Sequence, residues 1–488
     1  MIMTIKDLKP TAVWTIFDEI TKVPRPSKKE EKIRKYILDF AKANGIDAKT
    51  DEVGNVVLSK PATPGKEDAP TVIMQGHMDM VCESNKKDFD FDNSPITTII
   101  DGEWVHADNT TLGADNGIGV AASLAVMADK SLVHGPLEAL FTVDEETGMT
   151  GANNLGENMM NGSILLNLDS EDDGQFFIGC AGGIDTTITF DYKREMAPAD
   201  YHWFDIELAN LSGGHSGGDI HEGRANSNKL LARFLFGLSQ KHDIVLSEIS
   251  GGNLRNAIPR AAHAVVGVHT SKKEEVVVAF NEFVADVKNE YSHTDPAMDI
   301  TIATADKPEY AIDSDTTLRL IRSLYACPHG VISMSHDLEG LVETSTNLAS
   351  VKMQPDNTIL VTTSQRSSVE SRKYDIANQI EALFLMAGAK VTHGDGYPGW
   401  APNMNSAIMK IAADTYKELY GEEPLITAIH AGLECGLFLT KYPHLDMVSF
   451  GPTLRGVHSP SEKMHIPAVE RFWDQLVTIL RKVSDLKK

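Results

Sequence analysis

Three short apolar runs in the first 170 residues each end directly in acidic or histidine residues. They are TVIMQ at 71–75, EALFTV at 138–143 and SILLNL at 163–168, followed in turn by His77 and Asp79, by the acidic triplet 144–146, and by Asp169. Runs of this length and composition are typical of buried strands in a parallel sheet. Ligand sites in open α/β sheets lie at the carboxyl ends of the strands. We therefore expect these polar side chains to meet at one edge of a sheet.

A fourth acidic residue precedes a stretch of small residues. In the segment Gly113-Ala-Asp115-Asn-Gly117, Asp115 stands just before residues 117–127, whose small apolar side chains suit a helix packed tightly on the sheet. Charged side chains gathered at the end of a sheet must face a partner, and a cation is the natural one. Imidazole together with carboxylate is a borderline ligand set, which suits zinc, with Mn2+ or Co2+ as substitutes.

The spacing of these residues indicates a different role for each. Asp79, two residues after His77, is placed to accept the second ring N–H of that histidine and to fix its tautomer. Of the adjacent Glu145 and Glu146, one would bind metal while the other takes a proton from a water as general base. Taken alone, a His-x-Asp pair is more often structural, and an acidic run is more often a solvated turn. Their coincidence at strand ends favours a metal site.

Beyond about residue 185 the pattern changes and predicts a second domain inserted into the first. Two successive sets of strands and helices are expected, at 185–190, 227–240 and 273–291, and then at 316–327, 346–353, 358–364 and 374–386. The second set suggests a duplication within an α+β lid. After residue 399 the first pattern returns. We therefore predict an α/β catalytic domain made of residues 1–185 plus 399–488 and a lid domain of residues 186–398.

Composition excludes several classes of partner. The 488-residue chain is 42% apolar and 23% charged, which is ordinary for a globular protein of two or three domains. Its formal net charge of −24 repels nucleic acid and anionic membranes. The first ten residues lack the apolar core of a signal peptide, and no later stretch reads as a membrane span, so we expect a cytoplasmic protein. The four cysteines show no C-x-x-C spacing, which predicts neither a thiolate zinc site nor a disulfide framework.

Seven short motifs follow one another along nearly the whole chain. They are Gly76-His77-Met-Asp79, Gly113-Ala-Asp115-Asn-Gly117, Asp144-Glu145-Glu146-Thr-Gly148, Asn167-Leu-Asp169, Ser212-Gly-Gly-His215-Ser-Gly217, Asn256-Ala-Ile-Pro259 and Gly456-Val-His458-Ser-Pro460. This set resembles the M20 metallopeptidase family, and within it the bacterial aminoacyl-histidine dipeptidases. The resemblance implies a phosphorylase/hydrolase-like zinc-peptidase domain that carries a lid.

The same resemblance assigns two zinc ions per chain to five residues. It implies that His77 and Asp169 hold one ion. Glu146 and His458 hold the other, and Asp115 bridges the two. No ligand position departs from the family pattern, so the resemblance implies an active enzyme.

The resemblance also implies the residues that act on the substrate. Glu145 is the general base, and we count Asp79 with it among the catalytic residues because of its spacing from His77. The lid contributes His215, which polarises the scissile carbonyl from across a dimer or pseudo-dimer, although its glycine-rich segment also fits a flexible turn. Asn256 and Arg366 resemble residues that grip the substrate, since a guanidinium holds a terminal carboxylate with two hydrogen bonds. A pocket role is implied for two residues of the HAGLECG segment, His430 and Glu434.

The expected function is the hydrolysis of small dipeptides, such as the Xaa-His dipeptide carnosine (β-alanyl-histidine). A tripeptidase or an amide deacylase of the same family remains an alternative. A metal-loaded binding or scaffold protein without turnover is another, but the presence of Glu145 argues against it. We expect a homodimer joined through the lid, while a duplicated lid would let a monomer supply its own counterpart of His215.

Overall fold

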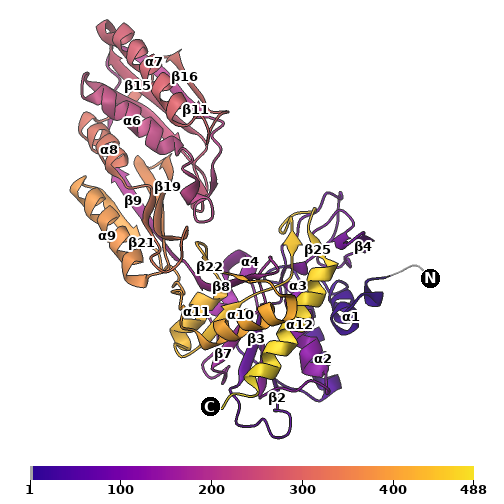
Figure 1. The fold of residues 1–488 in the computed structure, drawn as a ribbon. Coiled ribbons are helices and arrows are strands. Elements are labelled where there is room, and N and C mark those ends of the chain that lie inside the picture. The colour runs from indigo at the N-terminus through magenta and orange to yellow at the C-terminus, as the bar shows by residue number, and fades with distance from the viewer. Residues whose placement is uncertain (1–3, 488) are drawn as a thin grey trace. The chain divides into compact units, whose positions relative to one another are not determined.

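The chain builds one α/β unit, leaves it after Gly179 and returns to it at Pro402 (Figure 1). The structure, a computed structural model, describes residues 4–487. Unit 1 comprises Met1–Gly179, Pro402–Ala428 and Leu433–Lys488, and unit 2 comprises Cys180–Ala401 with Ile429–Gly432. Unit 1 has a mixed sheet with a parallel centre, and unit 2 has an antiparallel sheet with helices. The predicted fold class, an α/β domain with an inserted α+β domain, is confirmed.

The main sheet of unit 1 contains the apolar runs described above. Its strands lie in the order β1 (Asp47–Thr50), β2 (Val56–Lys60), β6 (Leu137–Thr142), β3 (Val72–His77), β7 (Ile164–Asn167), β23 (Asp446–Ser449), β8 (Gln175–Cys180) and β22 (Leu425–Ile429). Strands β6, β3, β7 and β23 are parallel neighbours. The register pairs His77 with Thr142 and Gln75 with Asn167, so the carboxyl ends of the central strands reach the same edge of the sheet.

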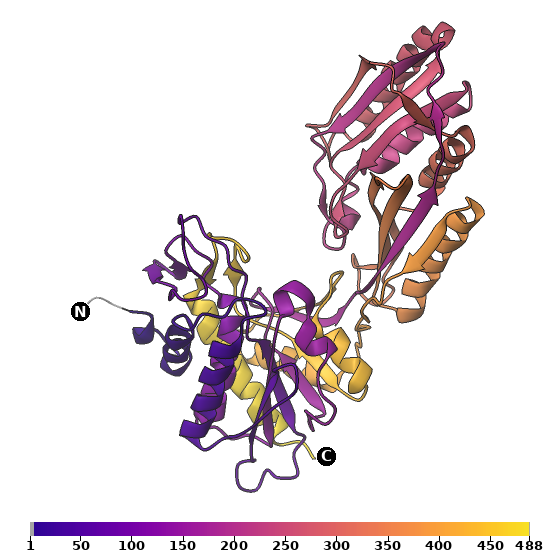
Figure 2. The same cartoon turned by 180° about the vertical axis from the view of Figure 1, so that it is seen from behind.

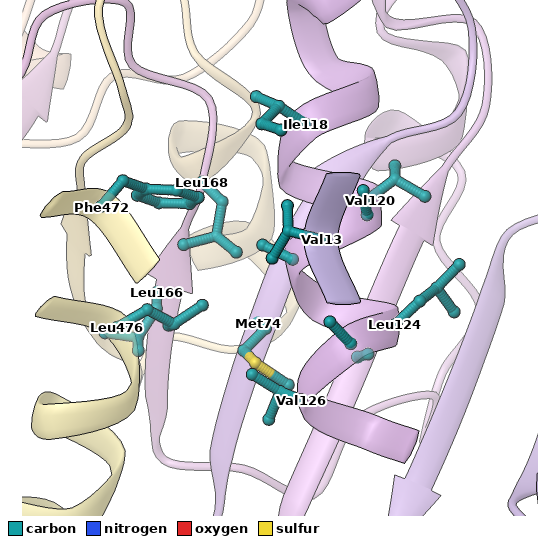
Figure 3. Packing of buried hydrophobic residues seen from close by; sticks show 14 of the residues in the cluster. Val13, Met74, Ile118, Val120, Leu124, Val126, Leu166, Leu168, Phe472 and Leu476 are labelled. Atoms are coloured by element: carbon teal, nitrogen blue, oxygen red, sulfur yellow. The ribbon is translucent and has the colours of Figure 1, made fainter. Parts of the chain in front are cut away.

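Helices accompany this sheet in unit 1, and the longer ones bury apolar side chains in its core. They are η1 (Ile5–Asp7), α1 (Thr11–Ile20), α2 (Glu31–Asn44), α3 (Ala114–Ala128), α4 (Glu145–Gly148), α5 (Thr150–Asn153), α10 (Ala407–Tyr420), α11 (Glu434–Lys441) and α12 (Ile466–Val483). Figure 3 shows Leu124 of α3 and Phe472 of α12 in one apolar cluster with Met74 of β3. A Cβ atom at Gly119 would lie 2.7 Å from the carbonyl oxygen of Leu168, so α3 approaches the sheet closely because it carries glycine there.

A small sheet lies beside the main sheet in unit 1. Its strands lie in the order β24 (Leu454–Arg455), β25 (Lys463–His465), β5 (Trp104–Ala107) and β4 (Thr98–Asp101). The loop between β24 and β25 carries His458, so antiparallel pairing holds both ends of that loop. These strands of two to four residues were not predicted, because they contain no apolar run long enough to stand out.

Unit 2 is built around one long antiparallel sheet. Its strands lie in the order β16 (Asp299–Ala305), β11 (Tyr201–Ala209), β15 (Ala262–His269), β13 (Ile244–Gly251), β19 (Val342–Met353), β20 (Thr358–Ser367), β9 (Gly182–Asp191) and β21 (Lys390–His393), with β18 (Gly330–Met334) paired to β19. Helices α6 (Ser227–Ser239), α7 (Lys273–Glu290), α8 (Ser314–Ala326) and α9 (Glu370–Met386) lie along this sheet (Figures 1 and 2). Short elements complete the unit: β10 (Arg194–Met196) with β17 (Tyr310–Ile312), β12 (Gly214–His215) with β14 (Ala257–Ile258), η2 (Ile220–Glu222) and η3 (Thr270–Lys272).

The sheet of unit 2 consists of two halves with the same order of elements. One half runs β11-α6-β13-β15-α7-β16, and the other runs β9-α8-β19-β20-α9-β21. When the strands of each half are numbered along the chain, both halves have the spatial order 4-1-3-2. These orders are β16-β11-β15-β13 and β21-β9-β20-β19. The halves join where β13 and β19 pair over Ser250–Gly251 and Val351–Lys352. The duplication itself stays a prediction, which this shared topology supports.

One strand lies in a different half from the one that its place in the sequence suggests. The expected strand at 185–190 falls in β9, which pairs with β20 and β21 and so belongs to the later half. The earlier half is therefore inserted after the first strand of the later one. The prediction grouped this strand with the elements that follow it directly in the sequence. In an insertion, however, strands pair with segments that are far apart in the chain. None of the helices within residues 4–487 combines the length and hydropathy of a membrane span.

Candidate metal centre

The five predicted metal ligands meet at the carboxyl edge of the parallel strands in unit 1. His77 is the last residue of β3, Glu146 follows β6 in the first turn of α4, and Asp169 stands two residues beyond β7. Asp115 comes from the first turn of α3, and His458 comes from the loop between β24 and β25. Parallel pairing of β6, β3 and β7 explains why residues so far apart in sequence lie together.

Asp115 lies between two groups of possible ligand atoms. Its Oδ1 is 3.1 Å from His77 Nε2, and its Oδ2 is 3.1 Å from His458 Nε2. His458 Nε2 also lies 3.0 Å from Glu146 Oε2, and His77 Nε2 lies 3.4 Å from Asp169 Oδ1. Each group places its ligand atoms within 4.8 Å of one another, and the two groups share Asp115. A carboxylate that presents one oxygen to each side has the geometry of a bridging ligand.

The side chains of the cluster fit a pair of divalent ions. Glu146 Oε1 and Asp169 Oδ1 are buried oxygens without a hydrogen-bond donor, although buried carboxylates normally have several. Burying such charges uncompensated is costly, and a cation offsets that cost. Two imidazoles and three carboxylates form a mixed nitrogen and oxygen set, which suits zinc and also accepts Mn2+ or Co2+.

The electrostatics of the cluster favour positive charge. Hydrogen bonds to Asp115 and Glu146 raise the pKa of His458 to about 11. Burial, together with the neighbouring charge of Asp115, raises the pKa of Asp169 to about 7. Burial also raises the pKa of Glu145 well above its usual value, and nearby carboxylates add to the shift. Carboxylates in such close contact repel one another, so the cluster is stabilised when it surrounds cations.

Asp79 does more than the sequence indicated. Its carboxylate lies 3.4 Å from His77 Nδ1, but Nδ1 makes no hydrogen bond, so the role of Asp79 in orienting the ring stays a prediction. It also accepts hydrogen bonds from the backbone amides of Glu145 (3.0 Å) and Glu146 (3.2 Å) and from the Ser27 hydroxyl (2.8 Å). Burial alone would raise the pKa of Asp79, but His77 and these donors lower it to about 2. Asp79 therefore joins the turn after β6 to the end of β3.

The first acid of the triplet is occupied by structural contacts. Asp144 accepts hydrogen bonds from the hydroxyls of Thr147 and Thr150, and its amide donates to Glu30 Oε1 at 2.9 Å. Its backbone has a φ of 53°, which turns the chain sharply from β6 into α4. This turn leaves the next two acids to face the cluster. Glu145 lies in a group with His77 and Glu146 whose ligand atoms are within 4.8 Å of one another.

Glu434 lies in unit 1 beneath the cluster. It is 2% exposed, and its Oε2 accepts from Gln75 Nε2 (2.6 Å) and from the Thr142 hydroxyl (2.8 Å). Burial raises its pKa to about 7. Gln75 continues the network by accepting from Asn167 Nδ2 at 2.6 Å. Glu434 thus links three of the strands whose ends carry the cluster.

In unit 2, two backbone amides fix the tautomer of His215. The amides of Gly217 (3.2 Å) and Gly218 (3.0 Å) donate to His215 Nδ1, which leaves the ring proton on Nε2. Burial, followed by the charge of Arg366, lowers the pKa of His215, so the ring is neutral near pH 7. His215 is therefore a preformed hydrogen-bond donor.

Three of the predicted unit 2 residues gather around Gly217. A Cβ atom there would lie 2.2 Å from the His430 carbonyl oxygen, 3.1 Å from His215 Cε1 and 3.3 Å from Arg366 Cδ, so only glycine lets them meet. Asn256 is exposed and lies beside His215, because its carbonyl accepts from the Ser216 amide at 2.8 Å in the pairing of β12 with β14.

Arg366 and His430 are buried polar residues of unit 2. Arg366 Nη1 donates to the Tyr397 hydroxyl at 2.9 Å, while its buried Nε has no acceptor. His430 Nε2 lies 2.7 Å from the Ser345 hydroxyl. Burial and the charge of Arg366 lower the pKa of His430 to about 3, so this ring is also neutral. A buried guanidinium with an unused N–H is suited to an anionic group of a ligand.

Sequence reasoning missed Arg25 and Glu462, the buried charges of unit 1 that bind the segment before Asp115. Glu462 stands four residues after His458 in a segment rich in serine and proline, where an acid is usually solvated. Its proximity to a predicted ligand is a weak signal that could have identified it. Arg25 carries no such signal.

Comparison with known proteins identifies the family. The model of peptidase family M20/M25/M40 matches residues 73–482. The chain is 43% identical over 480 residues to the cytosol non-specific dipeptidase of Escherichia coli (strain K12), and the alignment covers 98% of this chain and 99% of that relative. The chain belongs to peptidase family M20/M25/M40.

Solved structures agree with this assignment. The crystal structure of aminoacylhistidine dipeptidase from Vibrio alginolyticus matches with a TM-score of 0.93 at 44% identity, over 100% of this chain and 99% of that one. A tripeptidase from Staphylococcus aureus matches with a TM-score of 0.58 at 16% identity, over 98% of this chain and 100% of that one. The second match shows a shared fold alone.

We predict that the purified protein binds two divalent ions per chain and that chelation lowers both its melting temperature and its activity. Ions that bind only the folded state stabilise it. Asp115→Asn should hold at most one ion at saturating zinc, because an amide offers one oxygen and no charge for bridging. Asp144→Asn, which changes a neighbouring acid outside the cluster, should keep two. Metal analysis of the dialysed proteins decides the matter, and two tightly held ions in Asp115→Asn would remove its bridging role.

Proposed function

We propose that this protein is a dinuclear zinc peptidase that hydrolyses small dipeptides, including Xaa-His dipeptides such as carnosine, in the cytoplasm. The observation that carries the proposal is the shared position of Asp115 between His77 and His458, with Glu145 beside the same cluster. Similarity over the whole chain to proteins named cytosol non-specific dipeptidase and aminoacylhistidine dipeptidase supports the substrate class and the compartment.

The chemistry divides between the ions and the residues of unit 1. Two divalent ions, when bound, polarise the scissile carbonyl and acidify a water molecule. His77 and Asp169 would hold one ion, Glu146 and His458 the other, and Asp115 both. Glu145 takes a proton from the attacking water and returns it to the leaving amine. The hydrogen bond from its amide to Asp79 holds Glu145 in place for both transfers.

Residues of unit 2 complete the proposed reaction. His215, neutral and protonated on Nε2, donates a hydrogen bond to the carbonyl oxygen as negative charge develops there. Arg366 binds the terminal carboxylate of the dipeptide through its unused N–H, and Asn256 contributes a further polar contact. His430 shapes the pocket next to Arg366. We also propose that the protein is a homodimer.

The proposed function is tested by turnover of a substrate panel with and without added zinc. The panel contains Xaa-His dipeptides, other dipeptides, a tripeptide and an N-acylated amino acid. We expect zinc-dependent cleavage of dipeptides, with the tripeptide and the N-acyl substrate cleaved at least tenfold more slowly, measured as kcat/KM. Faster cleavage of the tripeptide would support a tripeptidase, and faster cleavage of the N-acyl substrate would support a deacylase. Zinc binding without turnover of any substrate would indicate a binding protein.

Two isosteric substitutions distinguish the proposed roles of the adjacent residues Glu145 and Glu146. Glu145→Gln cannot accept a proton, so we expect two bound ions and a loss of about 10²–10⁴ in kcat. Glu146→Gln should instead weaken metal binding, because an amide is a poorer ligand than a carboxylate. Metal content and kcat are measured on both variants. An active, metal-depleted Glu145→Gln protein would show that the two roles are reversed.

For the unit 2 histidine, we expect His215→Ala to keep both ions and to lose mainly kcat. A donor that acts on developing charge contributes about 2.7–4 kcal/mol to the transition state, or roughly 10²–10³ in rate. His221→Ala, at an exposed histidine of the same unit, is the matched control and should behave as wild type. Steady-state kinetics distinguish the alternatives: a raised KM with unchanged kcat would mean that His215 only binds substrate.

A further inference from the structure

Two buried charges outside the ligand set contact the segment that carries Asp115. Glu462 and Arg25 are each 2% exposed, and they reach residues 112–115 from opposite ends of the chain. Charged side chains are seldom buried so completely unless they are paired or fully hydrogen-bonded. The contacts that they make therefore indicate what each one does.

Glu462 accepts hydrogen bonds from four consecutive backbone amides. Its Oε2 accepts from Leu112 (2.7 Å) and Gly113 (3.0 Å), and its Oε1 accepts from Ala114 (2.7 Å) and Asp115 (3.3 Å). Both oxygens act only as acceptors, so the group serves as a carboxylate. Hydrogen bonds to a charged group are about twice as strong as neutral ones. The carboxylate thus fixes the backbone from Leu112 to Asp115.

Arg25 holds the same segment through its carbonyl groups. Its Nη2 donates to the Gly113 carbonyl, and its Nη1 donates to the carbonyls of Met78 (3.2 Å) and Asp79 (2.9 Å). Gly113 has a φ of 69°, and a Cβ atom there would lie 2.5 Å from Arg25 Nη2, so the position requires glycine. Arg25 therefore ties the chain just after β3 to the segment before Asp115.

Glu462 is attached to the loop that supplies the second histidine. Its amide donates to the Ser459 carbonyl at 3.0 Å, one residue beyond His458. The next residue, Lys463, begins β25 and pairs with His106 of β5. A single rigid segment therefore carries both His458 and the carboxylate that sets the backbone of Asp115.

We propose that Glu462 is a positioning residue for the pair of metal ions. It fixes the position of Asp115 relative to His458, while Arg25 holds the same segment against the end of β3. This inference rests on the proposed dinuclear centre and adds to it a residue that contacts neither the ions nor the substrate. Displacing Asp115 would disturb both ion positions, since its two oxygens face His77 and His458.

A purely structural role is the alternative, and unit 1 contains a carboxylate that plays one. Glu138, at the start of β6 and 3% exposed, accepts from the amides of Asn161 (2.9 Å) and Gly162 (3.0 Å). It lies at the opposite end of the strand from the metal cluster. Glu138→Gln is therefore a matched control for the loss of buried hydrogen bonds to backbone amides.

The test compares Glu462→Gln with Glu138→Gln in the full-length protein. Glutamine keeps the shape but places an NH2 group against amide donors. We expect both substitutions to lower the melting temperature of the metal-free protein. Only Glu462→Gln should weaken zinc affinity, by roughly 10–100-fold in calorimetric titration, as loss of an outer-shell group does. It should also change the visible absorption spectrum of the Co2+-loaded protein and lower kcat more than it raises KM.

Three results would overturn the proposal. The first is a Glu462→Gln protein with wild-type zinc affinity and an unchanged cobalt spectrum. The second is an equal loss of affinity in Glu138→Gln, which would trace the effect to general destabilisation. Should Glu462→Gln not fold, Glu462→Asp keeps the charge, and wild-type zinc affinity in that variant would also refute the proposal. A wild-type protein with fewer than two ions would instead contradict the dinuclear centre itself.

Discussion

Asp115 divides its two carboxylate oxygens between His77 and His458, and the carboxylates of Glu146 and Asp169 complete a cluster of like charge at the end of a parallel sheet. Groups of like charge in a buried place repel one another and lose their hydration. Such a cluster is stabilised when cations join it or when some of its acids take up protons, and when the backbone holds each carboxylate in place. Asp79 and Glu462 supply such contacts, since they bind the backbone amides of the segments that carry Glu146 and Asp115.

Hydrogen bonding separates the carboxylates of unit 1 into two kinds. Asp79, Asp144 and Glu462 have their oxygens filled by amide and hydroxyl donors, so they hold the backbone in place. Glu146 and Asp169 each keep one buried oxygen without a donor, as Glu434 also does, so these oxygens remain free to bind an ion. The donors on an acid therefore distinguish the carboxylates that hold the backbone from those with an oxygen left for an ion.

The sequence predicted the parts of the fold that depend on continuous patterns. The three apolar runs became β3, β6 and β7, and parallel pairing brought their polar ends together, as general rules for such sheets require. The predicted helix at 117–127 lies within α3. The short strands of the small sheet contain no such pattern, and they were missed. The strand at 185–190 was placed in the wrong half of unit 2, because its partners, β20 and β21, lie far along the chain.

The prediction of the site residues from the sequence was limited in the same way. Ligand-type residues at strand ends, such as His77, are visible in a sequence because their chemistry is unusual there. The roles of Glu462 and Arg25 could not be predicted from the sequence. Their partners are backbone groups, which are the same in every residue. A buried charge that binds only main-chain atoms is recognised from a structure alone.

The contacts around His215 show how unit 2 prepares a donor without a charge. Two amides from a glycine-rich turn bind Nδ1, which forces the proton onto Nε2, and burial beside Arg366 keeps the ring neutral. A neutral donor adds no charge of its own, and its hydrogen bond strengthens when the acceptor becomes negative, which suits the role proposed for His215. Gly217 contributes in two ways. Its amide binds His215 Nδ1, and its lack of a side chain leaves space for His215 and Arg366 around it. A flexible turn does not account for these contacts, since the glycine amides hold His215 in one tautomer.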